Sequence, residues 1–298
     1  MERIRTNNLK IKILLTCIVF IFASFFMTFS IFKISTAFAM TESEAKDYLE
    51  ERLVENPTQT IEIVVKSDKE ESISIQLLYD MALIEQCSKS DSKRDYVYWE
   101  LLGTYDKCDD NIINNPFGTD LHIIKFKARK NPSVSVKDEQ LFNRQVEQII
   151  STWDLKGKSD LEKLEMVYEY ITKNFEYDYD ALNDENGEGP AFTGAGTMKN
   201  KKGVCLGICL VFKNFCNHLG INTLLVTCSG ENPNDDGHIY PIAKVGKYWT
   251  YFDPTWDLGL EKKDWQYFNN DTNIDHEIDV MYTEPKFLAT HPTKPIKK

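Results

Sequence analysis

The sequence predicts an α+β protein in which a buried helix packs on an antiparallel sheet, preceded by a small α+β domain. The first observation is the segment 204–219, which has apolar side chains on nearly every face of a helix, as is typical of a core helix. The second is a series of alternating segments at 223–228, 238–245 and 247–253, which predict strands. The tight turn at Gly246 makes the last two strands neighbours.

The composition excludes several classes of function. The 298 residues are 42% hydrophobic, which is enough for a substantial core in one large domain or two smaller ones. The formal net charge of -11 leaves no basic surface for nucleic acid, so we expect no partner of that kind. Seven cysteines are too few for a dense disulfide framework, although Cys87 and Cys108 could pair.

Residues 1–39 have the features of a signal peptide or an N-terminal membrane anchor. Basic residues precede an uncharged run over 13–32, and Ala37 and Ala39 are the small residues that signal peptidase requires. We favour cleavage, but the uncharged run could also span a bilayer as an anchor. In either case we expect the folded part to lie outside the cytoplasm, secreted or tethered to the membrane only through residues 13–32.

Residues 40–130 are predicted to form the small N-terminal α+β domain. Thr41 and Glu44 form a capping box that starts a helix, and a second helix is predicted over 71–86. The stretch 109–118 is rich in turn-forming residues. Strands are predicted at 60–65, 95–102 and 121–128. No motif in this domain indicates a chemical function.

The second domain is predicted to cover 131–298, after a break in the pattern around Pro132. Helices are predicted over 137–152 and 160–174, and Tyr168 lies among the apolar residues of the core face of the latter. Residues 177–203 are polar and rich in glycine. A loop of that length beside a reactive centre would form a substrate-facing surface.

The core helix begins at a cysteine, Cys205, whose position indicates reactivity. The unpaired N–H groups and the dipole at a helix N-terminus favour thiolate over thiol. His238 and Asp253 are expected on neighbouring strands. A thiolate attacks a carbonyl, His238 transfers the proton to the leaving amine, and Asp253 holds the imidazole in the required tautomer. The backbone N–H of Cys205 is one oxyanion donor, and the sequence identifies no second one.

Each of these three residues also has a purely structural interpretation, because buried cysteines and turn aspartates are common. Their combination favours catalysis. His218 lies on the same helix as Cys205 but about 20 Å along it, at 1.5 Å rise per residue, so only His238 could serve the thiol. Cys209 and Cys216 are interpreted as small buried hydrophobic residues.

We predict no cofactor and no metal site. The cysteines of the core helix lack the paired spacing of zinc ligands. The segment 232–237 resembles the start of a calcium loop, but Ala243 occupies the position of the bidentate glutamate, so the segment is interpreted as a solvated turn. The aromatic residues Trp249, Tyr251 and Trp256 could line a cleft or fill the core, and the core is the preferred interpretation.

Residues from about 160 to 257 resemble the transglutaminase-like superfamily. The core of that family has a Gly-x-Cys-x-Gly segment at a helix start, then a histidine on one strand and an aspartate on the next, as found here in 203–207, Gly237-His238 and 251–257. Tyr177-Asp178 is also similar to the family's usual approach to the core. The resemblance implies a papain-like α+β fold in which Cys205 is the nucleophile, His238 the base and Asp253 the orienting residue.

The sequence departs from the family pattern beside the site. Family members commonly have an aromatic residue after the second glycine and an Ala-Trp-Asn run after the histidine, where this chain has Ile208 and Ile239-Tyr240-Pro241. Because Pro241 removes a strand N–H, we expect its strand to lie at a sheet edge or a bulge. These changes would reshape the pockets around the three chemical residues.

These observations predict an exported thiol enzyme that acts on peptide or side-chain amides through an acyl-Cys205 intermediate. Water as acceptor would make it a protease or amidase, and an amine would make it an acyltransferase, because cleft access and not the triad selects the acceptor. The expected partner is a protein or peptide, which could be associated with the cell envelope. The alternative is a non-catalytic surface or envelope binding module on the same fold.

Overall fold

The computed structural model describes most of the chain after the predicted export segment. The described residues are 39–55, 60–74, 77, 95–97, 99, 108–115, 118–127, 133–183, 189–228, 237–270, 289 and 291–296. Residues 1–38 of the predicted signal or anchor, Cys87, and residues 232–236 of the calcium-loop-like segment lie outside them. Within the described part, no helix combines the length and the apolar character needed to cross a membrane.

The chain divides into two compact units. Among the described residues, the first unit comprises 39–49, 60–77 and 108–127, and the second comprises the remainder. Residues 95–99 thus belong to the second unit although they precede part of the first in sequence. The predicted domain boundary near residue 131 stays a prediction.

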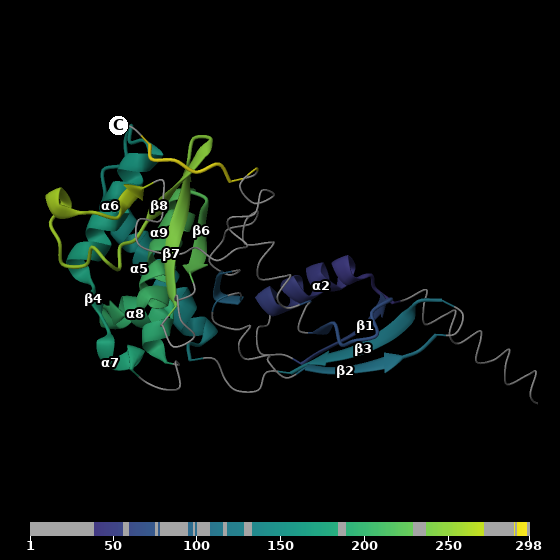
Figure 1. Cartoon of the computed structure of the whole chain (residues 1–298). Coiled ribbons are helices and arrows are strands. Elements are labelled where there is room, and N and C mark those ends of the chain that lie inside the picture. The colour runs from purple at the N-terminus through teal and green to yellow at the C-terminus, as the bar shows by residue number, and fades with distance from the viewer. Residues whose placement is uncertain are drawn as a thin grey trace, which may run out of the picture. The chain divides into compact units, whose positions relative to one another are not determined.

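The first unit contains a three-stranded antiparallel sheet in the order β1-β3-β2 and the start of helix α2 (Figure 1). The bounds are α2 (Glu42–Glu55), β1 (Ile61–Ser67), β2 (Cys108–Ile113) and β3 (Asp120–Phe126). The Thr41–Glu44 capping box is present, with the Glu44 N–H 3.2 Å from the Thr41 hydroxyl oxygen. Strands β1 and β3 lie where the alternation predicts them.

Strand β2 corrects the prediction of a turn over 109–118, which holds only after residue 113. Its turn-forming residues are tolerated because they are used as side-chain partners in an edge strand. The Asp110 carboxylate accepts a hydrogen bond from the Ile73 N–H at 2.9 Å and lies 3.1 Å from Nδ1 of His122 on β3. Pairing with β3 therefore overrides the local turn preference.

The predicted strand at 95–102 is wrong over its described residues, which are helical. In a helix, Asp95 and Trp99 lie on one side, four residues apart. That side faces helix α9 (Cys205–Leu219): Asp95 pairs with Nζ of Lys213 at 3.0 Å, and its other oxygen accepts from Asn217 at 2.6 Å. Tertiary contacts therefore decide a segment whose alternation indicates a strand. Of the helix predicted over 71–86, the described residues Ser74 and Leu77 are helical.

The second unit contains a helical layer beside a four-stranded antiparallel sheet in the order β6-β7-β8-β9 (Figure 1). The helices of this layer are α5 (Val136–Ser151), α6 (Asp160–Asn174), α8 (Gly194–Asn200) and α9. The strands are β6 (Thr223–Cys228), β7 (His238–Val245), β8 (Tyr248–Phe252) and β9 (Phe268–Asn270). The predicted α+β class, with a cysteine-bearing helix packed on an antiparallel sheet, is confirmed.

Helix α9 is the centre of this core. Its residues from Gly207 to Cys216 are all buried, and it ends at Gly220, whose φ of 70° suits a residue without a side chain. Lys213 is buried within it, where Nζ donates to the carbonyl of Thr223 at 2.8 Å in addition to its pairing with Asp95. The helix is therefore fixed to the sheet by polar as well as apolar contacts.

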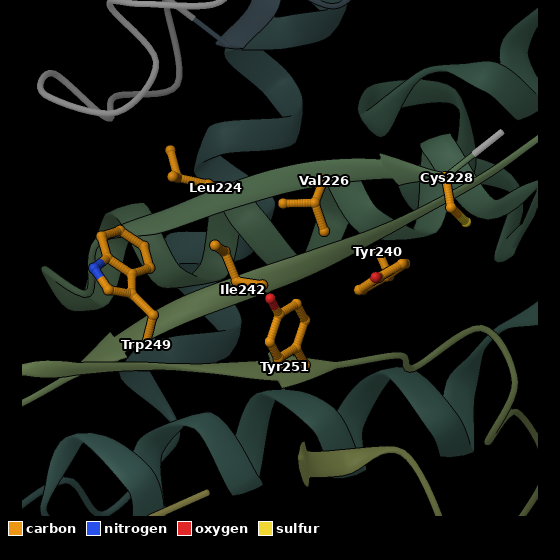
Figure 2. Close-up of a cluster of buried hydrophobic side chains, with 7 residues drawn as sticks. All are labelled: Leu224, Val226, Cys228, Tyr240, Ile242, Trp249 and Tyr251. Atoms are coloured by element: carbon orange, nitrogen blue, oxygen red, sulfur yellow. The ribbon is translucent and has the colours of Figure 1, made fainter. Parts of the chain in front are cut away.

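Both faces of the sheet are buried. On the α9 side, Leu225 and Ile239 pack with Cys209 and Leu210 of the helix. The seven side chains of the opposite cluster are shown in Figure 2: Leu224, Val226, Cys228, Tyr240, Ile242, Trp249 and Tyr251. Residues 291–296 lie along β8 beside this cluster, because the Trp249 N–H donates to the carbonyl of Pro292 at 2.8 Å. Burial on both faces explains why these strands are apolar almost throughout.

Candidate active site

Two glycines allow the cysteine-bearing helix to start where it does. A Cβ atom at Gly203 would lie 2.2 Å from Oγ1 of Thr197, and one at Gly207 would lie 2.1 Å from the same oxygen. The Cβ at Gly207 would also meet the carbonyl oxygen of Ala191 at 2.3 Å. Helix α8 and the short helix η3 (Pro190–Phe192) thus pack directly against the first turn of α9. The Gly-x-Cys-x-Gly segment is a packing requirement around Cys205.

Cys205 is the first residue of α9 and is partly exposed. The residue before it, Val204, provides no side-chain cap for the helix. The Tyr177 hydroxyl lies beside this first turn, where it interacts with both the backbone N–H and the thiol of Cys205. Burial, together with the Cys205 thiol, raises the pKa of Tyr177 well above its usual range, so its hydroxyl remains protonated.

Tyr177 reaches this position through a short parallel strand pair. Strands β4 (Glu176–Tyr177) and β5 (Lys202–Gly203) place Tyr177 opposite Gly203, two residues before the nucleophile. The Asp178 N–H donates to the Gly203 carbonyl at 3.0 Å and closes the pair. The sequence resemblance included Tyr177 but assigned it no role, since two-residue strands give no periodic signal.

The structure brings His238 and Asp253 into direct contact. Nε2 of His238 lies 2.7 Å from Oδ2 of Asp253, and the two side chains are 14% and 5% exposed. Burial lowers the pKa of His238, but hydrogen bonds and charge interactions with Asp253 and Cys205 outweigh it and raise the pKa to about 9. The imidazole is therefore protonated at neutral pH. It contacts both other members of the predicted triad.

The Asp253 carboxylate is oriented by the turn that follows it. Oδ1 accepts hydrogen bonds from the backbone N–H groups of Thr255 at 3.0 Å and Trp256 at 3.3 Å. Because these bonds occupy Oδ1, Oδ2 is the oxygen presented to His238. Pro254 restricts the backbone of the same turn. The run from Asp253 to Trp256 thus acts as a short frame for one carboxylate.

Trp256 is not the core residue that the sequence suggests. It is 42% exposed, and its ring stacks on that of His238 with centroids 5.5 Å apart and planes 27° apart. Trp249 and Tyr251 are buried as predicted. Apolar composition alone does not distinguish the three aromatic residues, but the turn after Asp253 carries Trp256 out of the sheet. Any group that approaches the imidazole from this side meets the indole.

The prediction of an edge position for Pro241 holds at the residue itself but not for its strand as a whole. Its strand, β7, lies inside the sheet between β6 and β8 and not at an edge. Pro241 pairs with Leu225 of β6, whereas the pairing with β8 begins one residue later, at Ile242 and Tyr251. The proline is accommodated because β7 is paired on one side only at this point.

The neighbouring thiols of α9 lack the environment of Cys205. Cys209 and Cys216 are completely buried, and burial raises the pKa of Cys209 well above its usual range and that of Cys216 to about 12. They behave as the small buried hydrophobic residues that the sequence suggests. Among the described residues, no three His, Cys, Asp or Glu side chains form a group able to hold a metal ion.

Comparison with known proteins finds one family match in this region. Residues 148–254 match the model of the transglutaminase-like superfamily, a range that includes Cys205, His238 and Asp253. This match confirms the resemblance noted in the sequence. No curated protein matches the chain.

Two solved structures are similar at low sequence identity. One is described as a TGase: it has 15% identity and a TM-score of 0.36, over 74% of this chain and 55% of the other. The second is a proposed cysteine protease from Cytophaga hutchinsonii, with 14% identity and a TM-score of 0.31, over 51% of this chain and 62% of the other. The chain thus spans less than two thirds of the length of either structure.

Proposed function

Because residues 148–254 of this chain match the transglutaminase-like superfamily, we propose that the protein is an exported thiol enzyme acting on peptide or side-chain amides. Cys205 is the nucleophile, His238 the proton carrier and Asp253 the orienting residue. The observation that carries the proposal is the environment of the His238 imidazole, whose Nε2 lies 2.7 Å from the Asp253 carboxylate and which also interacts with the Cys205 thiol. A structural histidine requires no such pair of partners.

The first step forms the acyl-enzyme. The Cys205 sulfur attacks the amide carbon, a C–S bond forms, and the carbonyl electrons move to oxygen. When the tetrahedral intermediate collapses, the C–N bond breaks and the nitrogen takes the proton of the His238 imidazolium. In the second step, the imidazole removes a proton from water or an amine, which attacks the thioester and releases the Cys205 sulfur. Water gives hydrolysis and an amine gives transfer.

Tyr177 is proposed as the second oxyanion donor, beside the backbone N–H of Cys205. Its hydroxyl lies beside that N–H and interacts with it, so a carbonyl oxygen that enters the site meets both groups. We expect Tyr177→Phe to lower kcat by roughly 10²-fold, the usual effect of losing one such donor. Tyr179→Phe is the matched control, because Tyr179 contacts the Tyr177 ring at 4.8 Å but is 68% exposed. Equal kcat values for the two variants would remove Tyr177 from the mechanism.

The central test is incubation of the purified full-length chain with a peptide library, with and without a primary amine. Mass shifts report hydrolysis or amine incorporation and so identify the acceptor. Cys205→Ala is expected to abolish all products, whereas Cys216→Ala, which changes a buried thiol on the same helix, should retain them. Activity that persists in Cys205→Ala would refute the mechanism. An absence of products together with slow, His238-independent alkylation of Cys205 would favour the non-catalytic binding module.

The proposed location outside the cytoplasm is supported by the basic segment, uncharged run and Ala37-Phe38-Ala39 at the N-terminus. The substrate would then be an exposed protein or peptide, such as one of the cell envelope. Expression of the full chain followed by fractionation tests this point. A mature N-terminus at residue 40 would indicate secretion, and an uncleaved protein in the membrane fraction would indicate a tether through residues 13–32.

A further inference from the structure

A buried polar pair lies behind Asp253 and takes no part in the proposed chemistry. Tyr168 of α6 and Asp257 are both fully buried, and the Tyr168 hydroxyl lies 2.6 Å from Oδ2 of Asp257. The same hydroxyl lies 2.7 Å from the backbone carbonyl oxygen of Asp253. One side chain of α6 thus contacts both ends of the turn that carries the orienting carboxylate.

Asp257 connects this turn to a second segment. Its Oδ1 accepts from the Gln266 N–H at 3.1 Å, and Oδ2 accepts from the Tyr267 N–H at 3.0 Å. Tyr267 in turn offers its carbonyl oxygen to the Asp253 N–H at 3.0 Å. The peptide groups on either side of the Asp253 Cα atom are therefore both held, the N–H by Tyr267 and the carbonyl by the one hydroxyl proton that Tyr168 shares between it and Asp257.

Packing alone does not require the polar atoms of this pair. The Tyr168 ring lies in an aromatic cluster with Trp265 at 4.8 Å, Phe268 at 5.1 Å and Phe252 at 6.3 Å, which a phenylalanine ring would also fill. A buried carboxylate is costly unless its oxygens are hydrogen-bonded. Burial and the nearby Asp257 raise the pKa of Tyr168 well above its usual range, so its hydroxyl stays a donor.

We infer that Tyr168 and Asp257 are positioning residues that fix the backbone of Asp253 and, through it, the orientation of His238. Both peptide groups of Asp253 are held, and its Oδ1 is hydrogen-bonded to the following turn. The Asp253 side chain is therefore fixed with Oδ2 directed at His238. The inference deepens the proposed function, on which its kinetic consequence rests. The geometry of the His238–Asp253 contact can, however, be measured without turnover.

The test is Tyr168→Phe in the full-length chain, which removes one oxygen and keeps the ring. We expect the His238 imidazole to titrate at lower pH than in the wild type, measured by NMR, because Oδ2 of Asp253 is no longer held against it. With an active substrate, kcat should fall at least tenfold while KM stays unchanged. Tyr170→Phe is the matched control, since the Tyr170 hydroxyl accepts from Nζ of Lys201 at 2.9 Å and not from this network.

If Tyr168→Phe leaves both the pKa of His238 and kcat at their wild-type values, the inference is overturned, even if the variant is less stable. If Tyr168→Phe does not fold, Asp257→Asn serves the same purpose, because it keeps the volume and Oδ1 but offers an amide to the Tyr168 hydroxyl. The two proposals can also fail separately. If the wild type shows no turnover but the His238 titration still shifts in Tyr168→Phe, the proposed enzyme activity is refuted and the positioning role is supported.

Discussion

Asp253→Asn should lower the pKa of His238. It should also reduce the free energy of unfolding of the protein, mainly below pH 9. The substitution keeps the size of the side chain and leaves an oxygen to accept from the turn. It removes the negative charge 2.7 Å from Nε2 of His238. Burial, which has the largest single effect on the pKa of His238, lowers that pKa. Without the Asp253 charge, less remains to offset this effect.

The magnitude follows from the pKa of His238. Its rise from 6.5 to about 9 corresponds to about 3 kcal/mol of preferential stabilisation of the charged form, at about 1.4 kcal/mol per pKa unit. Two partners, Asp253 and Cys205, provide this rise against burial, and the Asp253 carboxylate is the stronger. We therefore assign about 2 kcal/mol to Asp253 and expect the imidazole of the variant to titrate below about pH 8.

The direction of the pH dependence is fixed by the sign of the change. A raised pKa in the folded state stabilises the protein fully below the unfolded value of 6.5, and this stabilisation disappears as the pH rises through about 9. Asp253→Asn should thus reduce the free energy of unfolding by about 2 kcal/mol at pH 6, and the difference from the wild type should narrow by pH 10.

Urea unfolding at pH 6 and pH 10, combined with NMR titration, checks both expectations. The chain has five histidines, so the His238 resonance is assigned by its loss in His238→Gln. Identical His238 titrations in the wild type and Asp253→Asn would refute the electrostatic reasoning. So would a difference in unfolding free energy that is the same at both pH values.

Three further predictions concern residues around the site. Gly207→Ala should destabilise the protein by about 3 kcal/mol or more, measured by urea unfolding, because its Cβ would lie 2.1 Å from Oγ1 of Thr197. Lys213→Met should cost about 3–5 kcal/mol by leaving the Asp95 carboxylate without its cation, and Lys213→Met combined with Asp95→Leu should recover most of that loss. Trp256→Ala should raise KM for amide substrates more than it lowers kcat, and should change stability by less than about 1 kcal/mol, since the indole is 42% exposed.

The parts of the fold that the sequence predicts correctly are those with strong local signals. The predicted capping box starts α2, with the Thr41 N–H 2.7 Å from the Glu44 carboxylate, and α9 covers the segment predicted as the core helix. The strand prediction for residues 95–99 fails because the polar and apolar residues of this segment alternate as in a strand. Its helix is selected by contacts with Lys213 and Asn217, more than a hundred residues away in sequence.

The same distinction applies to the candidate site. Cys205, His238 and Asp253 are marked by a motif, and the structure brings them together, while their catalytic role stays a prediction. The polar role of Tyr168 gives no such signal, because the residue lies in the apolar stripe of a helix. The hydrogen-bond partners of its hydroxyl are 85 and 89 residues further along the chain. The available signal is Asp257, a second carboxylate four residues after Asp253, in a segment that is otherwise mostly aromatic and apolar.

The position of His238 between a carboxylate and a thiol explains how one imidazole could act first as an acid and then as a base. At rest, both partners raise the pKa of His238, so the ring carries the proton that a leaving amine needs. Once Cys205 is acylated, its sulfur no longer contributes charge or accepts a hydrogen bond, and burial acts on the imidazole against Asp253 alone. The ring then loses its proton more readily, and so becomes the base that the second step requires. The reaction itself would change the proton affinity of His238, provided that Asp253 keeps it in place throughout.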